Sequence, residues 1–437
     1  MAEGLGLRWV SIARLRSSLR TTLFRTSFFL LVTAALGNVL GFVFWLAVAQ
    51  TYPPADVGLA ATLFGVVLFL ASAGSLGLPF GIIRFLPSES DRPRLLNAAL
   101  LMSGIASAAL GLLFLAGLDL WAPTLTFVRA DPGLAAMCVL SIAGFGIGSV
   151  LDAAFVASRR ADYMTVRGVT FGVLRLPILL AGVFGILGIV LAWTTALAVS
   201  LGIGLLLLLP RVAPGFRPVA SIDAIRGTGI FGYSLWNHGA AITAAVPLSL
   251  LPVLILNTPA PQGGAEASAF FFAAAAIAGA LFFVPYAFTT SLFVEGSHPE
   301  ASYRRDVRHA IGFSLALIAL GILAAVGLGR WVLGLFGSEY ADAGYEALVI
   351  LALTSPLLLA NYVFATELRV AKRIRPLLAI TVVASGTVLL LAYWFLPAWG
   401  IAGAAGAFGL GQGVAVPLFA IERRKNGTNA EATRARE

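Results

Sequence analysis

Long apolar stretches with almost no charged residues recur along this chain, and they constrain its fold more than any other feature. Of 437 residues, only 29 are Lys or Arg and 20 are Asp or Glu, so a water-soluble core cannot accommodate the apolar excess. A bilayer core of about 30 Å is crossed by about 20 apolar helical residues. Twelve stretches are of this kind, at about 28–49, 58–82, 95–117, 134–157, 168–186, 188–209, 229–256, 267–293, 310–335, 344–366, 376–396 and 400–421.

These stretches are predicted to be helices. Lipid offers no hydrogen-bond partners, so a spanning backbone must satisfy its own N–H and C=O groups. A β-barrel would alternate apolar and polar residues over about ten residues per strand, whereas the runs here are continuous. The sequence therefore predicts an all-α membrane protein with about twelve transmembrane helices.

The positions of Lys and Arg predict the orientation. If the loops are numbered alternately from the N-terminus, 26 of the 29 basic residues fall in one set of loops together with both tails, and only Arg129 falls in the other set. Positively charged loops remain in the cytoplasm. We therefore predict a multi-pass protein of the bacterial cytoplasmic (inner) membrane with both termini cytoplasmic. The same distribution explains the net charge of +9 without a nucleic-acid partner.

The chain also shows a weak internal repeat. A shift of 212 residues places Gly188 on Gly400 and Arg211 on Arg423. Six crossings separate the copies, so they share one orientation, and such parallel repeats are related by an axis along the membrane normal. We expect two pseudo-twofold-related six-helix bundles around a central cavity. The predicted parts are a cytoplasmic amphipathic segment 1–27, lobes 28–210 and 229–421, a linker 211–228 and a tail 422–437.

Polar residues inside membrane spans are the first candidates for a functional site. Arg175 lies in the fifth predicted span, where a central arginine costs about 2.5–3.5 kcal/mol on translocon scales. Three interpretations remain open: it binds an anionic group of a substrate, it pairs with an acid such as Asp152, or it snorkels to the inner surface. Asp152, in the fourth span, is either a proton or cation site for coupling or only the partner of Arg175.

Five further residues are weaker candidates for substrate binding. Asn237 and His238 open the seventh predicted span, where they would contact a sugar or headgroup or form a structural pair. Asn38, Asn361 and Gln412 are single polar residues in otherwise apolar spans.

The sequence shows no sign of an enzyme, a metal site or a cofactor. It lacks the HExxH, GK[ST] and GxSxG patterns of metalloproteases, P-loops and nucleophile elbows, and the predicted outer loops are short. The one cysteine, Cys138, lies in an apolar run and is expected to be a small buried hydrophobe.

Three stretches resemble a known family. Residues 335–343, with Leu335, Phe336, Gly337 and Tyr340, are similar to an "LFG-x-x-Y-x-x-A" stretch of polysaccharide flippases. Residues 49–58 resemble the family's "A-R-x-x-x-P-x-x-x-G" stretch, with Gln50 in place of the usual arginine. Residues 400–412 resemble its closing helix. The chain thus looks like the polysaccharide transporter (O-antigen/exopolysaccharide flippase-like) branch of the multidrug/oligosaccharidyl-lipid/polysaccharide exporter superfamily.

The resemblance implies a flippase that moves a polyprenyl-diphosphate-linked oligosaccharide across the membrane by alternating access. Its partners would be that substrate, the lipid bilayer, and glycosyltransferases or a polymerase of the same pathway. One alternative is an ion-coupled drug or metabolite antiporter of the same superfamily. Another, from a different class, is a non-transporting membrane scaffold. An exporter of cationic drugs should carry acidic cavity residues, so Arg175 beside a single candidate acid, Asp152, favours an anionic substrate.

Overall fold

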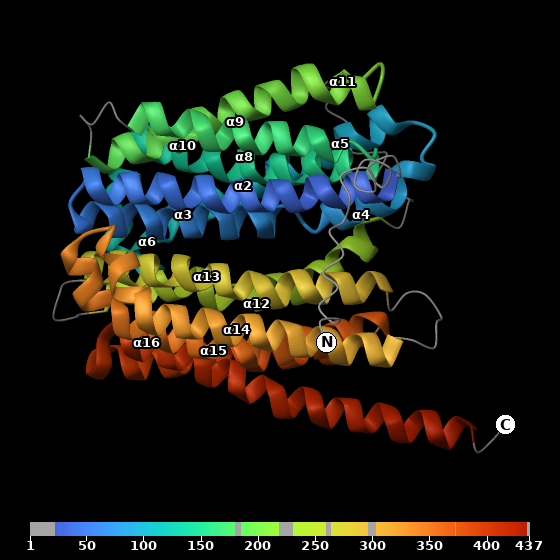
Figure 1. Ribbon diagram of the computed structural model, residues 1–437. Coiled ribbons are helices and arrows are strands. Elements are labelled where there is room, and N and C mark those ends of the chain that lie inside the picture. Colours follow the sequence, from blue (N-terminus) through green and yellow to red (C-terminus); the bar gives the residue numbers. More distant parts are fainter. Residues whose placement is uncertain are drawn as a thin grey trace, which may run out of the picture.

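The structure is a computed structural model that describes residues 22–179, 185–217, 230–258, 264–295, 303–371 and 373–434. Within these ranges the chain is almost entirely helical, and no strand occurs in them. Most of the predicted segment 1–27 and of the predicted linker 211–228 lies outside the described residues, as do the last three residues of the tail. The described helices form two lobes that lie side by side (Figure 1).

The N-terminal lobe begins its helices at residues suited to that position. Proline occupies one of the first two helical positions of α3, α5 and α8, where its missing N–H is not needed. The side chains of Asp91 and Asp131 cap α5 and α8 by accepting backbone N–H bonds. The lobe contains α2 (Thr22–Thr51), α3 (Pro54–Gly74), α4 (Leu78–Phe85), α5 (Arg92–Ala116), α8 (Pro132–Ala157), α9 (Ala161–Leu179) and α10 (Gly185–Gly202), which continues through a π-helical segment, Ile203–Leu208, into α11 (Leu209–Val212).

The C-terminal lobe consists of longer helices. They are α12 (Ile230–Asn257), α13 (Gly264–Glu295), α14 (Tyr303–Gly334), α15 (Ser338–Val370) and α16 (Ile374–Arg434). The last of these is broken at Gly400, whose φ of 52° and ψ of −140° lie in a region that glycine alone adopts readily. Because of this break, α16 supplies two antiparallel crossings.

The predicted twelve-helix, two-lobe fold is confirmed. Among the described residues, ten helices are long and apolar enough to cross a membrane. The eleventh crossing is α9, which carries two arginines, and the twelfth is the part of α16 after Gly400. Several predicted boundaries were wrong. The predicted span 58–82 is divided into α3 and α4, α14 begins at Tyr303 rather than near residue 310, and α9 begins at Ala161 rather than near residue 168. Arg167, which the sequence placed in a loop, is therefore part of the helix.

The two lobes share a backbone feature. The last crossing of each lobe opens at a glycine with positive φ, 54° at Gly185 and 52° at Gly400. The predicted shift of 212 pairs Gly188, three residues after Gly185, with Gly400. The register of the repeat stays a prediction.

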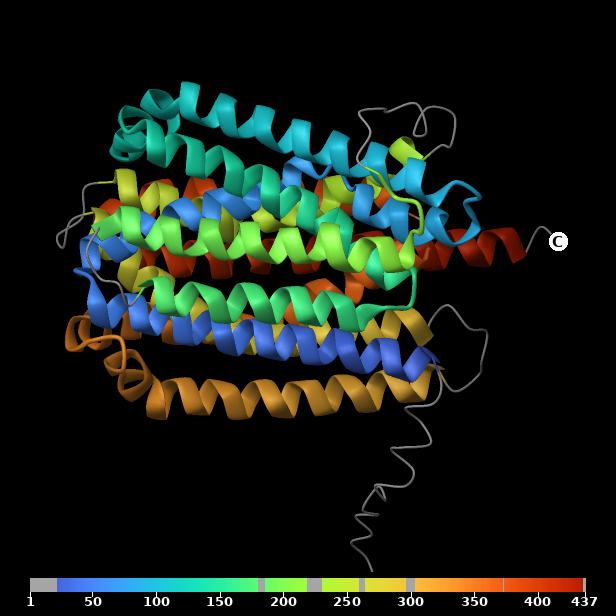
Figure 2. The ribbon, with the colours of Figure 1, turned by 90° about the horizontal axis from the view of Figure 1, so that it is seen from above.

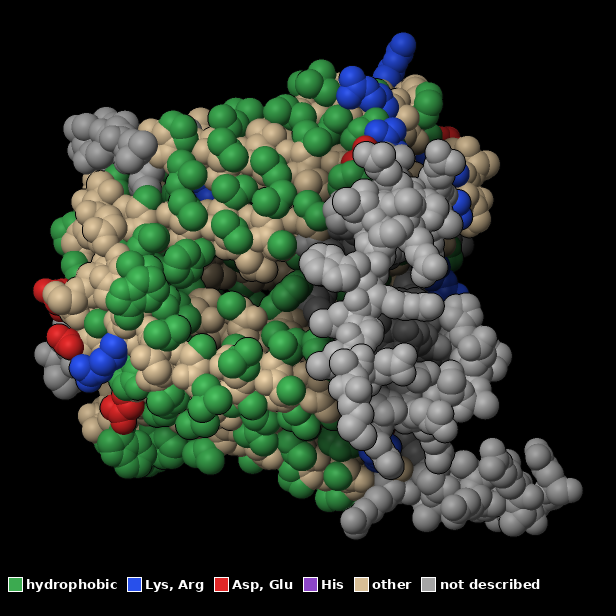
Figure 3. Space-filling view, viewed as in Figure 1, with side chains coloured by type: hydrophobic (Ala, Val, Ile, Leu, Met, Phe, Trp, Pro, Cys, Tyr) green, Lys and Arg blue, Asp and Glu red, His purple; other side chains and the backbone are tan. Residues whose placement is uncertain are grey.

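The charged side chains separate the two ends of the bundle. One end of the bundle, which we call the basic end, is rich in arginine. Arg84, Arg211 and Arg369 lie there in the last turns of α4, α11 and α15, and Arg159 lies there between α8 and α9. Apolar side chains cover much of the surface between the ends, and acidic side chains gather at the opposite end (Figure 3). We call this opposite end the far end. The arginine distribution predicts that the basic end faces the cytoplasm.

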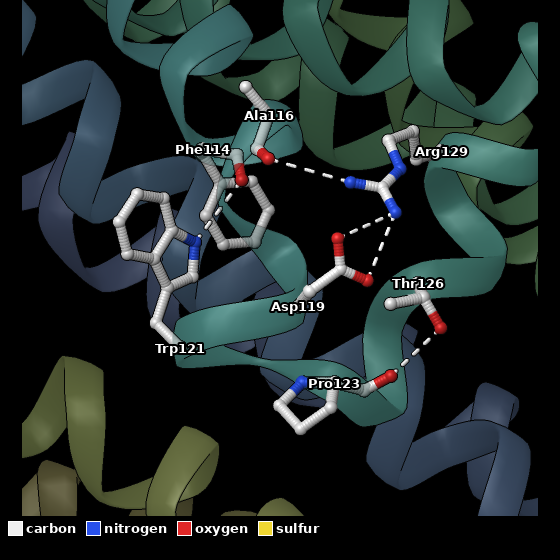
Figure 4. A network of polar contacts seen from close by, with 7 residues as sticks. All are labelled: Phe114, Ala116, Asp119, Trp121, Pro123, Thr126 and Arg129. Atoms are coloured by element: carbon white, nitrogen blue, oxygen red, sulfur yellow. Dashed lines mark hydrogen bonds and ion pairs between the residues drawn. The ribbon is translucent and has the colours of Figure 1, made fainter.

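The longest connection of the far end, between α5 and α8, is tied together by its own polar contacts (Figure 4). The guanidinium of Arg129 lies 2.8 Å from the carboxylate of Asp119, and the indole N–H of Trp121 donates to the carbonyl of Phe114 at 3.1 Å. The connection contains α6 (Leu118–Trp121), the 3-10 turn Pro123–Leu125 and α7 (Thr126–Ala130). Arg129, the lone arginine of the predicted outer loops, therefore has a local counter-charge.

The lobes meet mainly through two helices of each. In the N-terminal lobe α3 packs against α12 and α13, and α4 packs against α12. On the face shown in Figure 3, the surface is hollowed between the lobes. Seen from above, α2 lies between the other helices of the N-terminal lobe and α14 (Figure 2).

Candidate functional site

Arg175 lies in the half of α9 nearer the far end. It is 14 residues after Ala161, where the helix begins at the basic end, and this corresponds to about 21 Å along the axis. Only 4% of the residue is exposed. The interpretation that Arg175 snorkels to the inner surface was wrong, because the guanidinium is both buried and too far from that surface.

Aromatic rings, rather than carboxylates, surround the Arg175 guanidinium. Its Cζ lies 4.4 Å from the ring centre of Phe44 on α2 and 5.0 Å from that of Phe171 on its own helix. Its Nη2 lies 3.7 Å from the point where a Cβ on Gly41 would be, and its Nε has no hydrogen-bond partner among the described residues. Among the described side chains, no acid forms an ion pair with Arg175. Within this part of the chain, its charge is stabilised by the two cation–π contacts, each worth about 0.5–2 kcal/mol.

Asp152 is paired with a different arginine from the one that the sequence suggested. The Nε of Arg167 donates to its Oδ1 at 2.8 Å, and the Nη2 of Arg167 contacts its Oδ2. The two parallel bonds form the bidentate geometry that is strongest for this pair of groups. Arg175 lies eight residues further along α9, about 12 Å away. The alternative that Asp152 is the partner of Arg175 was therefore wrong.

The sequence held a signal for this pair that the predicted span boundaries concealed. Asp152 lies five residues before the end of α8 at Ala157, and Arg167 lies six residues after the start of α9 at Ala161. Residues at equal distances from the turn of an antiparallel helical pair lie at the same depth. At that turn, a hydrogen bond to Asp162 raises the pKa of the Arg160 guanidinium and helps to fix the hairpin.

The stem of Arg167 is buried by glycines on neighbouring helices. A Cβ on Gly148 would lie 3.1 Å from its Nη1, and a Cβ on Gly204 would lie 3.2 Å from its Cδ. Gly204 belongs to the π-helical segment Ile203–Leu208. The hydroxyl of Ser200 donates to the backbone carbonyl of Arg167 at 2.8 Å. The pair is thus enclosed by α8, α9 and α10, deep in the N-terminal lobe.

The remaining predicted residues fall in three separate places. His238 is buried where the lobes meet, with its Nε2 2.8 Å from the carbonyl oxygen of Ser72. The side chain of Asn237 lies outside what the structure describes, so the predicted Asn237–His238 pair stays a prediction. Asn361 donates through Nδ2 to the side-chain oxygen of Gln412 at 2.9 Å, inside the C-terminal lobe.

Asn38 is the predicted residue nearest to Arg175. It is exposed on α2, three residues before Gly41, so it lies one turn along the helix from the glycine that Arg175 faces. The structure therefore places Asn38 and Arg175 near each other in the N-terminal lobe, while Asp152, Asn361 and Gln412 each have a structural partner.

Sequence reasoning missed the contacts that hold the two lobes together at the far end. The hydroxyls of Thr62 and Ser268 are 2.7 Å apart across the lobe interface, and the rings of Trp45 and Phe272 are 4.6 Å apart. A Cβ on Gly58 would lie 1.8 Å from a backbone carbonyl of α13. Gly58 is the last residue of the family-like stretch 49–58. A glycine there allows two helix backbones to approach closely, and this was the signal that the sequence offered for the contact.

The described residues include no group of three His, Cys, Asp or Glu side chains that could hold a metal ion. Apart from Ser and Thr hydroxyls, the polar side chains discussed above in the described helices are an arginine without an ion-pair partner, an ion pair, an amide pair and a histidine at the lobe interface.

Solved structures with a similar fold are membrane transporters and flippases, not enzymes. An inward-facing multidrug resistance MATE family transporter of the MOP superfamily is matched with a TM-score of 0.67 and 16% identity, over 90% of this chain and 96% of that one. The lipid II flippase MurJ, in an inward closed conformation, is matched with a TM-score of 0.69 and 11% identity, over 90% and 87%. A MOP superfamily transporter from Pyrococcus furiosus is matched with a TM-score of 0.64 and 17% identity, over 92% and 95%.

The fold and its location are thus established at the level of a class. This chain is a multi-pass membrane protein with the two-lobe, twelve-helix fold that MOP superfamily transporters share. No family model matches the sequence, and no curated protein matches it.

Proposed function

We propose that this protein is a flippase that moves a polyprenyl-diphosphate-linked oligosaccharide from the cytoplasmic leaflet to the outer leaflet, for surface polysaccharide synthesis. The observation that carries the proposal is the buried Arg175 guanidinium, which no carboxylate among the described residues neutralises. A charge in this position is unfavourable unless a counter-ion reaches it. An anionic substrate group would supply that counter-ion during transport.

A diphosphate suits this arrangement chemically. Guanidinium binds phosphate oxygens through parallel N–H donors, and these charge-assisted bonds are about twice as strong as neutral ones. Phe44 and Phe171 contact the guanidinium of Arg175 through their rings, which accept no conventional hydrogen bond from it, so its N–H donors would serve the ligand. Asn38, one turn away on α2, would add a polar contact to the headgroup.

The proposed direction follows from the two ends of the bundle. If the basic end is cytoplasmic, the lobe contacts through Thr62, Ser268 and Gly58 close the opposite side. The substrate headgroup would then enter from the cytoplasm once the lobe contacts nearer the basic end, such as that of His238 with Ser72, have separated, and would leave after the far-end contacts separate. One structural neighbour, MurJ, is itself a lipid II flippase, which supports a lipid-linked substrate. Glycosyltransferases or a polymerase of the same pathway would be the partners.

The alternative, an ion-coupled drug or metabolite antiporter, has support from the multidrug transporter with the same fold. The charge of the candidate residues weighs against a cationic drug. Asp152, the candidate coupling site, is already bound to Arg167, so it is not free to exchange a proton or cation alone. The Pyrococcus furiosus neighbour is reported to have a binding pocket of reverse polarity that suggests a different function, so pocket charge varies on this fold.

The decisive experiment measures flipping of a fluorescent polyprenyl-diphosphate glycan in vesicles that contain the purified protein. Arg175→Gln should lower the flipping rate roughly 10- to 100-fold, since a hydrogen bond to a charged group is worth about 1.5–3 kcal/mol. Arg175→Lys should retain part of the activity. The matched control is Arg330→Gln, because Arg330 is a far-end arginine that is 66% exposed, and this variant should flip normally.

Each other outcome changes the proposal. Normal flipping by a folded Arg175→Gln variant would remove the arginine from the substrate site. If the wild-type protein moved drugs but not the glycan lipid, it would be an antiporter, and if it moved neither while binding glycosyltransferases, the scaffold interpretation would stand. In cells, loss of the gene should leave the lipid-linked intermediate on the inner leaflet and deplete the surface polymer.

A further inference from the structure

Two family-like stretches that are far apart in the sequence meet across the lobe interface. The side-chain amide of Gln50, at the far end of α2, donates to the backbone carbonyl of Leu335 in the other lobe. About two turns earlier on α2, the ring of Phe42 packs edge-on against Phe336, with ring centres 5.3 Å apart. We call these two contacts the far-end latch. Gln50 stands at the position where the related family usually has arginine.

The C-terminal half of the latch is rigid. The turn that joins α14 to α15 ends at Gly337, whose φ is +146°, a conformation that favours glycine. Phe336 and Tyr340 are almost completely buried, with ring centres 5.9 Å apart, and Tyr340 also packs against Phe270 on α13 at 5.0 Å. Because the turn is anchored in its own lobe, the latch can open only if α2 moves relative to it.

The same part of α2 also contacts the candidate anion site. Phe44 lies 4.4 Å from the Arg175 guanidinium and Gly41 faces its Nη2, while Phe42 belongs to the latch. These three residues lie within about one helical turn. Asn38 is exposed about one turn earlier on the same helix. A small movement of this turn therefore changes both sets of contacts.

We propose that α2 links the anion site to the far-end latch. An anion held between Arg175 on α9 and Asn38 on α2 shifts this turn of α2, which already packs against α9 through Leu40 and Gly172, and moves it away from the 335–337 turn. Occupancy then breaks the bond between Gln50 and Leu335 and opens the far end, whereas the empty protein keeps it closed. The inference rests on the proposed function for its ligand, an isoprenyl diphosphate headgroup, and adds how that ligand controls the gate.

Disulfide trapping tests this coupling. The pair Thr62→Cys and Ser268→Cys, in a Cys138→Ala background, replaces hydroxyls that are 2.7 Å apart across the lobes, and thiols at these positions reach disulfide distance only when the far end is closed. The matched control pair is Ser141→Cys and Thr194→Cys, whose hydroxyls are 2.9 Å apart within one lobe. Cross-linking rates under mild oxidation are compared with and without farnesyl diphosphate.

The expected result has three parts. Farnesyl diphosphate should slow cross-linking of the interlobe pair several-fold and leave the control pair unchanged. Arg175→Gln and Asn38→Leu should each remove this response. Gln50→Ala should lower the rate of the interlobe pair about 2- to 10-fold without any ligand, as the loss of one hydrogen bond predicts.

The outcomes separate the coupling from the proposed function. If flipping in vesicles depends on Arg175 but the interlobe pair ignores the diphosphate, the coupling through α2 is wrong. If the diphosphate slows cross-linking only when Arg175 is present, yet no glycan lipid is flipped, the coupling holds and the assigned cargo is wrong. An equal ligand response in the interlobe and control pairs would also overturn the coupling, because it would report a general change in thiol reactivity.

Discussion

Removing the carboxylate of Asp152 should destabilise the protein far more than removing a carboxylate at its surface. Asp152→Ala leaves the Arg167 guanidinium, whose side chain is 12% exposed, without a counter-charge. Breaking a buried pair from one side costs about 3–5 kcal/mol. Because the Asp152 side chain keeps 20% exposure, we expect the lower end of that range, about 3 kcal/mol.

The chain provides a matched control for this variant. Asp119 and Arg129 form an ion pair at the far end, with side chains that are 63% and 43% exposed. Exposed pairs contribute about 0–1 kcal/mol, so Asp119→Ala should barely change stability. The free energy of unfolding would be measured in mixed micelles by denaturant titration. The double variant Asp152→Leu/Arg167→Met should recover most of the loss, because it leaves no buried charge unpaired.

Two results would refute this reasoning. One is a cost for Asp152→Ala no larger than that for Asp119→Ala, and the other is a double variant no more stable than the single variant. The same proteins also address ion coupling. If the double variant is stable but no longer transports, Asp152 does more than neutralise Arg167, and its candidacy as a coupling site is strengthened.

Three further predictions concern glycine and amide positions. Asn361→Leu should lower the free energy of unfolding by about 1–3 kcal/mol, because it leaves the Gln412 side chain without its hydrogen-bond partner. A second change, Gln412→Leu, should recover part of this loss, and no recovery would contradict the proposed pair. Gly400→Ala should cost about 1–2 kcal/mol because of its positive φ, whereas Gly406→Ala, in open space within a regular helix, should be neutral or stabilising; equal effects would show that the backbone break is not strained. Gly58→Ala should keep the far end from closing, since its Cβ would lie 1.8 Å from a carbonyl of the other lobe, and unchanged cross-linking there would contradict this.

The sequence predicted the fold well because the fold depends on hydropathy, which is a property of each residue taken alone. Apolar length alone marks the spans, and the even number of crossings before the repeat implies two lobes in parallel. The boundary of α9 was misplaced for the same reason. Hydropathy places Arg167 outside the span, whereas in the helix its charge is paired with Asp152 on α8.

The sequence indicated which types of residue to consider for the candidate site, but not which side chains contact one another. The sequence singled out polar residues in apolar spans, yet which of them meet depends on how helices pack within a lobe, and periodicity does not specify this. Asn361 and Gln412 were predicted as separate binding candidates and are bonded to each other. One prediction paired Arg175 with an acid, but the structure surrounds its guanidinium with aromatic rings.

The last crossing of each lobe opens at a glycine with positive φ, Gly185 or Gly400, and the two lobes have a parallel relation. This relation allows the relative energies of the inward-open and outward-open forms to change during evolution. An axis along the membrane normal superposes each end of the bundle on itself and never on the opposite end. No symmetry therefore ties the energy of an inward-open form to that of an outward-open form, as it would in an inverted repeat. Single substitutions at one end can shift this balance without a compensating change at the other, so related proteins can rest in different states while they keep one architecture.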